Sequence, residues 1–309
     1  MTDTVLSDEF EKIVKRVSRH LKGKEEAIVM TMTAYFAGGH ILLEDIPGVG
    51  KTTLAKSFSA VMGLDFGRIQ FTSDLLPADI TGMMYYDRKS GGFILKKGPI
   101  FTGFLLADEI NRSMPKTQSA LLEAMEEGQV TIDGVEYALP EPFFVIATQN
   151  PYEEVGTFPL PYSQLDRFIC SFGIGYPDRE AERTILSGYE TIYDMDSEKP
   201  IMDTKRSREI MDEVKRVHLS DAMLDYIQNI VAFSRESGLF RYGLSTRGAL
   251  ALTAMTRARA RLHGRDYAIP DDLQSVSAEV CIHRLSFREG KSEIGRLRDE
   301  FLSQIHPDP

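Results

Sequence analysis

The sequence predicts an α/β fold in which a parallel five-stranded sheet lies between two layers of helices, followed by an all-α unit. Two observations lead to this prediction. As far as Pro177, short apolar segments typical of buried strands alternate with longer segments of helical periodicity, which is the pattern of a parallel three-layer sheet. Beyond Pro177 the strand signals disappear and helical patterns repeat.

The elements of the α/β unit follow in order along the chain. A helical pattern runs from Phe10 to Phe36 and is broken around Gly23. Five short apolar segments then predict the strands of the sheet, at 41–43, 68–71, 104–107, 143–148 and 168–174. Helices are expected between them at 52–62 and 117–127.

Two insertions interrupt this alternation and are predicted to be β-hairpins. The first covers about 83–95 and turns at Ser90-Gly91-Gly92. The second covers about 129–139 and turns at Asp133-Gly134, a pair that favours a type I′ turn. Both hairpins are expected to project from the core.

The length of 309 residues favours two packed units, and 42% hydrophobic with 27% charged residues is typical of a globular protein. We expect the α/β unit at 1–190, a charged connection at 191–208 and the all-α unit at 209–309. In the all-α unit, helices are predicted at 222–234 and 246–262. A further helix begins at Pro270, followed by carboxylates that suit its positive end.

The formal net charge of −10 disfavours non-specific binding of nucleic acid, because a polyanion is repelled unless basic side chains cluster locally. One local cluster exists and consists of Arg257, Arg259, Arg261 and Arg265. Two-residue steps would spread these side chains around a helix, so we interpret them as a solvated polar face.

The other chemistry-bearing residue types point to no transition-metal site. Cys170 and Cys281 form no CxxC pair and the six histidines form no HExxH pair, so buried free thiols are expected. No apolar segment approaches the roughly 18 residues of a membrane span. The segment from Met1 to Arg19 lacks the basic and apolar parts of a signal peptide, and a cytoplasmic protein is therefore expected.

The segment from Glu44 to Thr53 has the composition and the context of a phosphate-binding loop. It follows a predicted strand and opens a helix, so backbone N–H groups and the helix N-terminus would face a phosphate. Lys51 would reach the β- and γ-phosphates, and Thr52 would bind Mg²⁺. A chance glycine turn is the alternative, against which the coincidence of strand, loop and helix argues. The expected nucleotide-binding residues here are Asp45 (in place of the first glycine of GxxxxGK[ST]), Pro47, Gly48, Val49, Gly50, Lys51, Thr52 and Thr53.

The strand predicted at 104–107 ends in two adjacent carboxylates, Asp108 and Glu109, which is the Walker B pattern. Successive residues of a strand point to opposite sides, so the two carboxylates are expected to have different tasks. We assign Asp108 to Mg²⁺ and Glu109 to polarising the attacking water. Strand ends often carry carboxylates, but downstream of a phosphate-binding loop the pattern becomes specific.

Asn150 follows the strand predicted at 143–148. In open α/β sheets ligands bind beyond the carboxyl ends of the strands, so this side chain is placed to contact the γ-phosphate or the attacking water. The alternative is an asparagine that stabilises the turn before Pro151. The residues alone leave both interpretations open.

Several short motifs occur in a fixed order along the chain. They are Asp108–Arg112, Thr148–Pro151, Gly156–Pro161 and Gln164–Phe168, with Phe71–Pro77 and Pro115–Gln118 in addition. Together they resemble the motifs of the MoxR family of AAA+ ATPases, over a length from about Gly23 to Arg284. The resemblance implies an AAA+ P-loop core with a lid domain, ATPase activity, and ATP or ADP with Mg²⁺ as cofactors.

The resemblance also implies roles for individual residues. Asn150 matches the sensor 1 position, and Arg167 matches the arginine finger that reaches a neighbouring subunit's nucleotide. The alternative for Arg167 is a salt bridge with Asp166 or another acid. Arg247 resembles sensor 2, and whether it acts within its own subunit or across an interface stays open.

Gly23 and Lys24 take the place of the family's adenine-side Gly-Gln pair, with Lys24 departing from the pattern. The two hairpins correspond to inserts that face a central pore or the substrate in relatives. The resemblance further implies a hexameric ring that remodels or matures a protein client, including metal-cofactor insertion, with a von Willebrand factor A-type partner as a separate chain. Two alternatives are a nucleic-acid motor, which the acidic charge disfavours, and a nucleotide-gated binding module with negligible turnover, which Glu109 and Arg167 disfavour.

Overall fold

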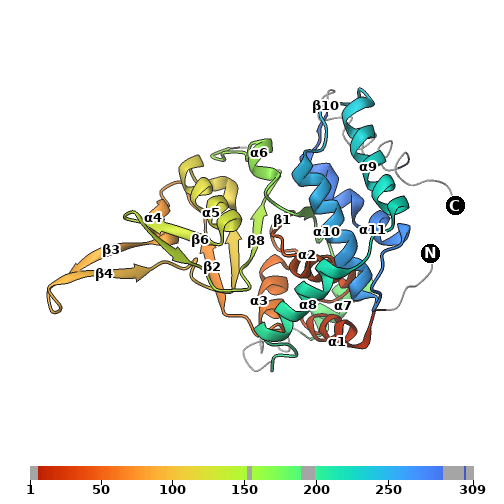
Figure 1. Ribbon diagram of the computed structural model, residues 1–309. Helices are drawn as coiled ribbons and strands as arrows, with labels where there is room; N and C mark the ends of the chain where they lie inside the picture. The colour runs from red at the N-terminus through yellow and green to blue at the C-terminus, as the bar shows by residue number, and fades with distance from the viewer. Residues whose placement is uncertain (1–5, 152–154, 189–198, 288–302, 304–309) are drawn as a thin grey trace.

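The computed structural model describes residues 6–151, 155–188, 199–287 and 303, and at its centre lies a five-stranded sheet (Figure 1). The strand order is β2-β5-β8-β1-β9, and every neighbouring pair is parallel. The strands are β1 (Ile41–Glu44), β2 (Phe66–Gln70), β5 (Phe104–Asp108), β8 (Phe144–Gln149) and β9 (Cys170–Phe172). The predicted parallel α/β core is confirmed.

Alternate residues of the strands face two separate apolar clusters, as a strand between two helical layers requires. On β5, Leu106 lies in a cluster with the helices α1, α2 and α3. Its neighbour Leu105 lies in a second cluster with α4 and α5. These helices are α1 (Asp8–Val17), α2 (Glu25–Phe36), α3 (Lys51–Val61), α4 (Pro77–Thr81) and α5 (Pro115–Glu127), with the short turns η1 (Ile110–Arg112) and α6 (Tyr162–Leu165) after β5 and β8.

Helix ends in the core follow from proline and glycine at particular positions. The helix α5 begins with Pro115, whose fixed φ suits the first helical position, and ends at Gly128 with a φ of 64°. The helix α3 begins directly after Gly50, whose φ of 103° lies in the left-handed region that favours glycine. The phosphate-binding loop therefore leads straight into a helix N-terminus.

Both predicted hairpins are present and form separate two-stranded sheets. The strands β3 (Gly82–Asp87) and β4 (Gly92–Lys97) form a long arm that projects from the core, away from the C-terminal helices (Figure 1). The strands β6 (Gln129–Ile132) and β7 (Val135–Ala138) turn at Asp133 and Gly134. Their φ angles of 49° and 80° are both positive, as a type I′ turn requires.

The C-terminal unit is helical, as predicted, with one addition. The helix α7 (Arg179–Ser187) precedes this unit. The helices of the unit are α8 (Thr204–Arg216), α9 (Asp221–Glu236), α10 (Thr246–Leu262) and α11 (Pro270–Cys281), followed by the turn η3 (Ile282–Arg284). The addition is an antiparallel pair, β10 (Phe240–Tyr242) and β11 (Ser286–Phe287). Strands of two or three residues are too short to show a period of two in the sequence.

The expected connection at 191–208 includes the start of a helix. The Asp203 side chain accepts a hydrogen bond of 2.7 Å from the Arg206 N–H and so caps α8, which begins at Thr204. The part of this segment at 191–198 lies outside the described residues.

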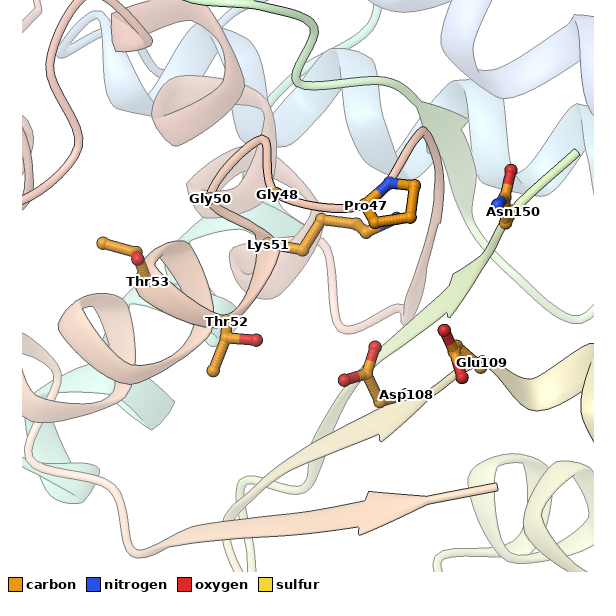
Figure 2. Close-up of a pocket in the computed structure, with 9 residues that line it drawn as sticks. All are labelled: Pro47, Gly48, Gly50, Lys51, Thr52, Thr53, Asp108, Glu109 and Asn150. Carbon is orange, nitrogen blue, oxygen red and sulfur yellow. The ribbon is translucent and has the colours of Figure 1, made fainter. Parts of the chain in front are cut away.

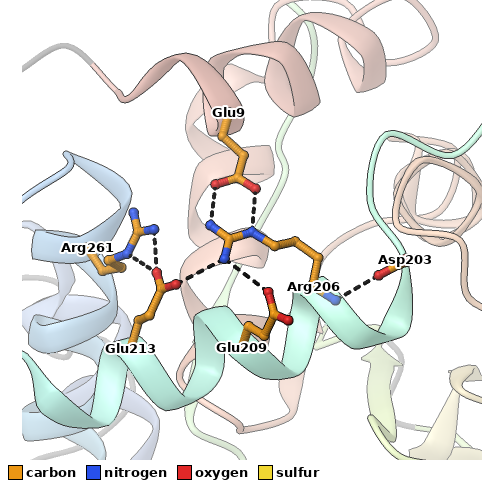
Figure 3. Close-up of polar contacts among 6 residues, drawn as sticks. All are labelled: Glu9, Asp203, Arg206, Glu209, Glu213 and Arg261. Carbon is orange, nitrogen blue, oxygen red and sulfur yellow. Dashed lines mark hydrogen bonds and ion pairs between the residues drawn. The ribbon is translucent and has the colours of Figure 1, made fainter.

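The C-terminal unit packs on the α1–α3 layer and shares its apolar cluster. A polar network follows the same boundary (Figure 3). The Arg206 guanidinium of α8 donates to both carboxylate oxygens of Glu9 of α1, at 2.9 and 3.0 Å, and at 3.0 Å to Glu213. Glu213 also accepts from the Nε of Arg261 of α10 at 2.7 Å. The network thus ties the N-terminal helix to two helices of the C-terminal unit.

The interpretation of the arginine cluster as a solvated polar face is wrong for at least two of its members. Arg261 pairs with Glu213 and lies over the ring of Phe10, 5.4 Å from its centroid. Arg265 binds both carboxylate oxygens of the buried Asp272 at 2.6 Å. The prediction missed these contacts because each partner comes from a distant or buried position that helical periodicity does not show.

Cys170 and Cys281 are both buried and free, which confirms the expectation for the thiols. Within residues 6–151, 155–188, 199–287 and 303, no helix is long and apolar enough to cross a membrane.

Candidate active site

A cavity of about 300 Å³ lies beyond the carboxyl ends of the central strands (Figure 2). Three predicted motifs meet there: the phosphate-binding loop after β1, the paired carboxylates after β5 and the asparagine after β8. The residues that line it are Pro47, Gly48, Gly50, Lys51, Thr52, Thr53, Asp108, Glu109 and Asn150. The structure therefore brings together most of the residues that the sequence assigned to nucleotide binding.

Lys51 lines this cavity from the start of α3. Its ammonium group donates a hydrogen bond of 2.6 Å to the backbone oxygen of Asp45. Burial lowers the pKa of Lys51, while the charges of Asp45, Asp108 and Glu109 act in the opposite direction. The group is thus held at the start of α3 and faces the carboxylates across the cavity.

Asp108 is oriented by two neighbouring side chains. One carboxylate oxygen accepts a hydrogen bond of 2.6 Å from the hydroxyl of Thr148, and the other pairs with Arg68 at 2.7 Å. The Thr52 hydroxyl and the Asp108 carboxylate face the same space (Figure 2). Hydroxyl and carboxylate oxygens are ligands that Mg²⁺ accepts, so these two residues fit a magnesium site.

Glu109 leaves the strand in a left-handed conformation, with a φ of 56°. For a residue other than glycine this conformation costs about 1 kcal/mol. Its N–H donates to the Thr148 hydroxyl at 2.9 Å, and its carboxylate accepts from Gln70 at 2.7 Å and pairs with Arg112 at 3.2 Å. The carboxylates of Asp108 and Glu109 thus have different partners, and the turn in the backbone contributes to this difference.

Sequence reasoning missed three residues around these carboxylates: Arg68, Gln70 and Thr148. Arg68 and Gln70 are alternate residues of β2, and Gln70 lies opposite Asp108 in the parallel register. Two polar side chains two positions apart at the end of a predicted strand are the signal that was available for them. Thr148 is fully buried at the neighbouring strand end, where a hydroxyl needs a partner.

The family-like motifs contact one another directly. The backbone oxygen of Asn111 accepts a hydrogen bond of 2.6 Å from Phe158 N–H. The side chain of Gln118 on α5 donates at 2.9 Å to the Phe158 oxygen and at 3.1 Å to the Ser113 oxygen. The segment around Phe158 is thereby fixed beside the turn that carries Glu109.

Four predicted nucleotide-binding residues do not line the cavity. The Asp45 carboxylate accepts from Ile46 N–H at 2.8 Å and from Gly175 N–H at 2.6 Å, which ties the loop to the segment after β9. Val49 is buried in the apolar cluster. Lys24 donates at 2.6 Å to the Tyr176 oxygen.

The fourth residue, Gly23, lies against α7. A Cβ at this position would lie 2.9 Å from the Cβ of Ala181, so a larger residue would displace α7. Lys24 thus contacts the chain between β9 and α7, and Gly23 lies against α7 itself. Their role beside an adenine stays a prediction.

Arg167 and Arg247 also lie outside this cavity and meet at a second one of about 280 Å³. Arg167 pairs with Glu126 at 2.7 Å and donates at 2.9 Å to the Leu122 oxygen. Arg247 pairs with the same glutamate. The alternative considered for Arg167 was a salt bridge with Asp166 or another acid, and within the subunit such a salt bridge is present with Glu126. Asp166 pairs with Arg284 at 2.8 Å.

Two family models match the chain. The first, described as the ATPase family associated with various cellular activities (AAA), matches residues 40–170. The second, described as the AAA lid domain, matches residues 232–305. The first match contains the three motifs of the cavity, and the second contains Arg247.

Relatives cover most of the chain. The protein YeaC of Bacillus subtilis, described as uncharacterized, is 45% identical over 89% of this chain and 86% of its own length. Chaperone MoxR1 of Mycobacterium tuberculosis is 38% identical over 89% of this chain and 75% of its own length. Protein MoxR of Methylorubrum extorquens is 29% identical over 95% of this chain and 90% of its own length.

A crystal structure of a Cytophaga hutchinsonii protein, named for an expected ATPase activity, superimposes on the fold with a TM-score of 0.88. The two sequences are 36% identical, and the match covers 96% of this chain and 93% of that one. The arrangement of core and C-terminal helices is therefore shared with a solved structure.

Proposed function

Since the chain belongs to the MoxR family of AAA+ ATPases, and is therefore an ATPase, we propose that it forms rings that couple ATP hydrolysis to the remodelling of a protein client. The observation that supports the proposal is that two groups of predicted site residues lie at separate cavities of one subunit. Lys51, Asp108 and Glu109 line the expected phosphate-binding cavity. Arg167 and Arg247 do not line it and lie at the second cavity.

Within the cavity each residue has a task that its position supports. The N–H groups of the loop and Lys51 bind the phosphates of ATP or ADP. Thr52 and Asp108 would hold Mg²⁺, which spreads the negative charge of the phosphates when it is bound. Glu109 orients a water molecule and accepts its proton, and Asn150 donates a hydrogen bond to the γ-phosphate or to that water. Mg-dependent ATP hydrolysis is the reaction that uses this set of groups.

Arg167 and Arg247 complete the site of a neighbouring subunit. Both side chains are partly exposed, at 32% and 45%, and neither lines the cavity of its own subunit. An arginine supplied by another molecule stabilises the charge that develops during phosphoryl transfer and accelerates it by roughly 10³-fold or more in measured systems. A closed ring, which we expect to be a hexamer, would give every cavity such a neighbour.

The client is a protein in this proposal. The arm formed by β3 and β4 carries Tyr86 and Phe93 near its tip, with 56% and 70% of their surfaces exposed. Their rings lie 5.5 Å apart in an edge-to-face arrangement, and exposed aromatic pairs of this kind suit contact with a protein segment. The relative named Chaperone MoxR1 supports a chaperone-like role. Maturation of a metal-containing client, with a von Willebrand factor A-type partner, is the specific form we propose.

A trap experiment tests this function. We expect the Glu109→Gln variant to bind ATP but to hydrolyse it at least about 10²-fold more slowly, because the base is lost while the phosphate site is kept. Clients should then co-purify with Glu109→Gln in the presence of ATP. They should be absent from Lys51→Ala, which lacks the phosphate-binding ammonium group. Identical sets of co-purifying proteins from both variants would contradict ATP-dependent action on a client.

A further inference from the structure

Glu126, near the C-terminal end of α5, bridges the two arginines of the second cavity. Its Oε2 lies 2.7 Å from the Nη1 of Arg167, and its Oε1 contacts the Nη2 of Arg247. One carboxylate therefore binds a cation from the α/β core with one oxygen and a cation from the C-terminal unit with the other. No motif of the sequence pointed to this residue.

The last turn of α5 is fixed in place beneath Glu126. The backbone oxygen of Met125 accepts a hydrogen bond of 3.0 Å from the Nε2 of the buried His40, whose Nδ1 accepts from Val145 N–H at 3.1 Å. The backbone oxygen of Leu122, one turn earlier, accepts from Arg167 at 2.9 Å. The helix end thus supplies both a carbonyl and a carboxylate to the same guanidinium.

The side that carries Arg247 is fixed as well. Arg247 lies in the first turn of α10, whose N-cap Ser245 accepts from Gly248 N–H at 3.0 Å. The Ser245 hydroxyl donates at 2.8 Å to Asp166, the residue before Arg167. Glu126 and this serine contact therefore hold the start of α10 beside Arg167.

Charge explains why a carboxylate is needed between the arginines. Two guanidinium groups side by side repel each other, and each long side chain has many rotamers to lose before it can point in one direction. Glu126 reduces the local charge from two positive charges to one and fixes both side chains. Each guanidinium has five N–H donors on three nitrogens. Glu126 engages one nitrogen of each, and the Leu122 oxygen accepts from the same nitrogen of Arg167, so the other nitrogens can still bind an anion.

We propose that Glu126 is a positioning residue that holds Arg167 and Arg247 as one cationic pair for the γ-phosphate of ATP bound by a neighbouring subunit. This inference rests on the proposed function, in which the arginines act across a subunit interface. It adds that the two arginines act as a unit, and that the unit depends on a residue that touches neither ATP nor the reacting atoms.

Mixed assemblies test the proposal. Arg167→Ala subunits keep an intact phosphate-binding cavity but lack the finger, and Lys51→Ala subunits keep both arginines but bind no ATP. Each alone should be inactive, and the mixture should regain hydrolysis wherever an intact arginine pair meets an intact cavity. We expect the donor Lys51→Ala/Glu126→Gln to restore at least about tenfold less activity than the donor Lys51→Ala, because the charged hydrogen bonds that orient the pair are lost.

The matched control is the donor Lys51→Ala/Glu127→Gln, which changes the exposed neighbour of Glu126 on α5 and should restore activity fully. Equal restoration by the Glu126→Gln donor and by its control would overturn the positioning role, and so would higher restoration. Failure of the single-variant Lys51→Ala donor is a different result, which would overturn the action across an interface itself.

A second measurement separates positioning from a loss of folding. In the otherwise unchanged chain, Glu126→Gln should lower kcat at least about tenfold while the Kd for a fluorescent ATP analogue stays within about twofold, since Glu126 does not line the phosphate cavity. Glu126→Asp keeps the charge and should retain more activity than Glu126→Gln. A weakened Kd with unchanged kcat would contradict the proposal.

Discussion

Thr148 shows how much of the site depends on a single hydroxyl. It accepts a hydrogen bond from the Glu109 N–H and donates one to the Asp108 carboxylate, while being fully buried. A strained backbone at Glu109 persists only where neighbouring contacts hold it, and this hydroxyl is one of those contacts. The hydroxyl therefore orients the Asp108 carboxylate directly and holds Glu109 through its backbone N–H.

Replacement of Thr148 by Val, which has the same shape, should lower kcat on the order of a hundredfold, because the carboxylates lose their alignment. The Kd for ATP should stay within about threefold, since Lys51 and the loop are untouched. Steady-state hydrolysis and equilibrium binding are the measurements, with Thr131→Val on the exposed side of β6 as the control. A Thr148→Val enzyme of wild-type kcat would exclude this alignment role.

His40 makes the stability of the fold depend on pH. Burial lowers the pKa of His40 from 6.5 to about 4, against a smaller opposing effect of its bond to the Met125 oxygen. The unfolded chain therefore binds a proton more readily than the folded chain in this window, so the free energy of unfolding should fall as the pH drops from about 6.5 to 4.

Chemical denaturation at several pH values between 4 and 7 measures this dependence. The variant His40→Gln should show a shallower slope than the wild type. Part of the slope should remain, because burial also lowers the pKa of His283 well below its ordinary value. Equal slopes for the two proteins would rule out His40 as a source of the pH dependence.

At the scale of residues, the sequence predicted the lining of the cavity where a functional residue follows a strand directly along the chain. Lys51, Thr52, Asp108, Glu109 and Asn150 all line one cavity, because each follows a strand and parallel strands bring their carboxyl ends to the same edge. Residues that depend on contacts between distant segments were missed. Glu126 is the clearest case, since its partners lie 41 and 121 positions further along the chain.

At the scale of elements, the helices α1, α8 and α10 are joined by the Arg206 network. We expect Arg206→Met to lower the free energy of unfolding by about 1 kcal/mol, because Glu9 and Glu213 would keep half-buried charges without this partner. Lys215→Met breaks the ion pair between Lys215 and Asp212, whose side chains are 75% and 56% exposed. This variant should change the free energy of unfolding by less than about 0.5 kcal/mol. Urea titrations compare the two, and equal losses would show that the network contributes no more than an exposed ion pair.

The β3–β4 arm should be separable from catalysis. Tyr86 and Phe93 are exposed and contact each other. Because their side chains bury little surface, the double variant Tyr86→Ser/Phe93→Ser should have a free energy of unfolding within about 0.5 kcal/mol of the wild type. In the Glu109→Gln background the same changes should remove co-purifying clients, which quantitative mass spectrometry can measure. Tyr242→Ser, at a 66% exposed position of β10, is the control and should remove none. Retention of the same clients by the Tyr86 and Phe93 variant would place the client surface elsewhere.

The boundaries of helices and strands were predictable where hydrophobic periodicity, proline or glycine marks them. The helix α10 matches its predicted range, and α11 begins at the predicted Pro270. The pair of short strands β10 and β11 and the start of α8 were not foreseen. The strands β10 and β11 are too short to show a hydrophobic pattern. The helix α8 begins in a charged segment, and its N-cap Asp203 is a residue type that is equally common in turns.

At the scale of the whole molecule, the lid and one side of the core share an apolar cluster, and the cavity with Lys51 and the cavity with the two arginines are separate. The phosphate cavity belongs to the core alone. The arginine pair joins core and lid through Glu126 and Ser245. In the proposed ring, a neighbour's ATP would contact both units at once, and its hydrolysis would change the restraint on the lid.

The dependence of ATP hydrolysis on protein concentration tests this shared site most directly. The rate per subunit should rise with concentration until assembly is complete, and Arg167→Ala should stay lower by roughly 10³-fold at every concentration while it binds ATP as the wild type does. A wild-type rate per subunit that is constant from the lowest concentration, together with an Arg167→Ala variant of equal activity, would contradict a site completed by the adjoining subunit.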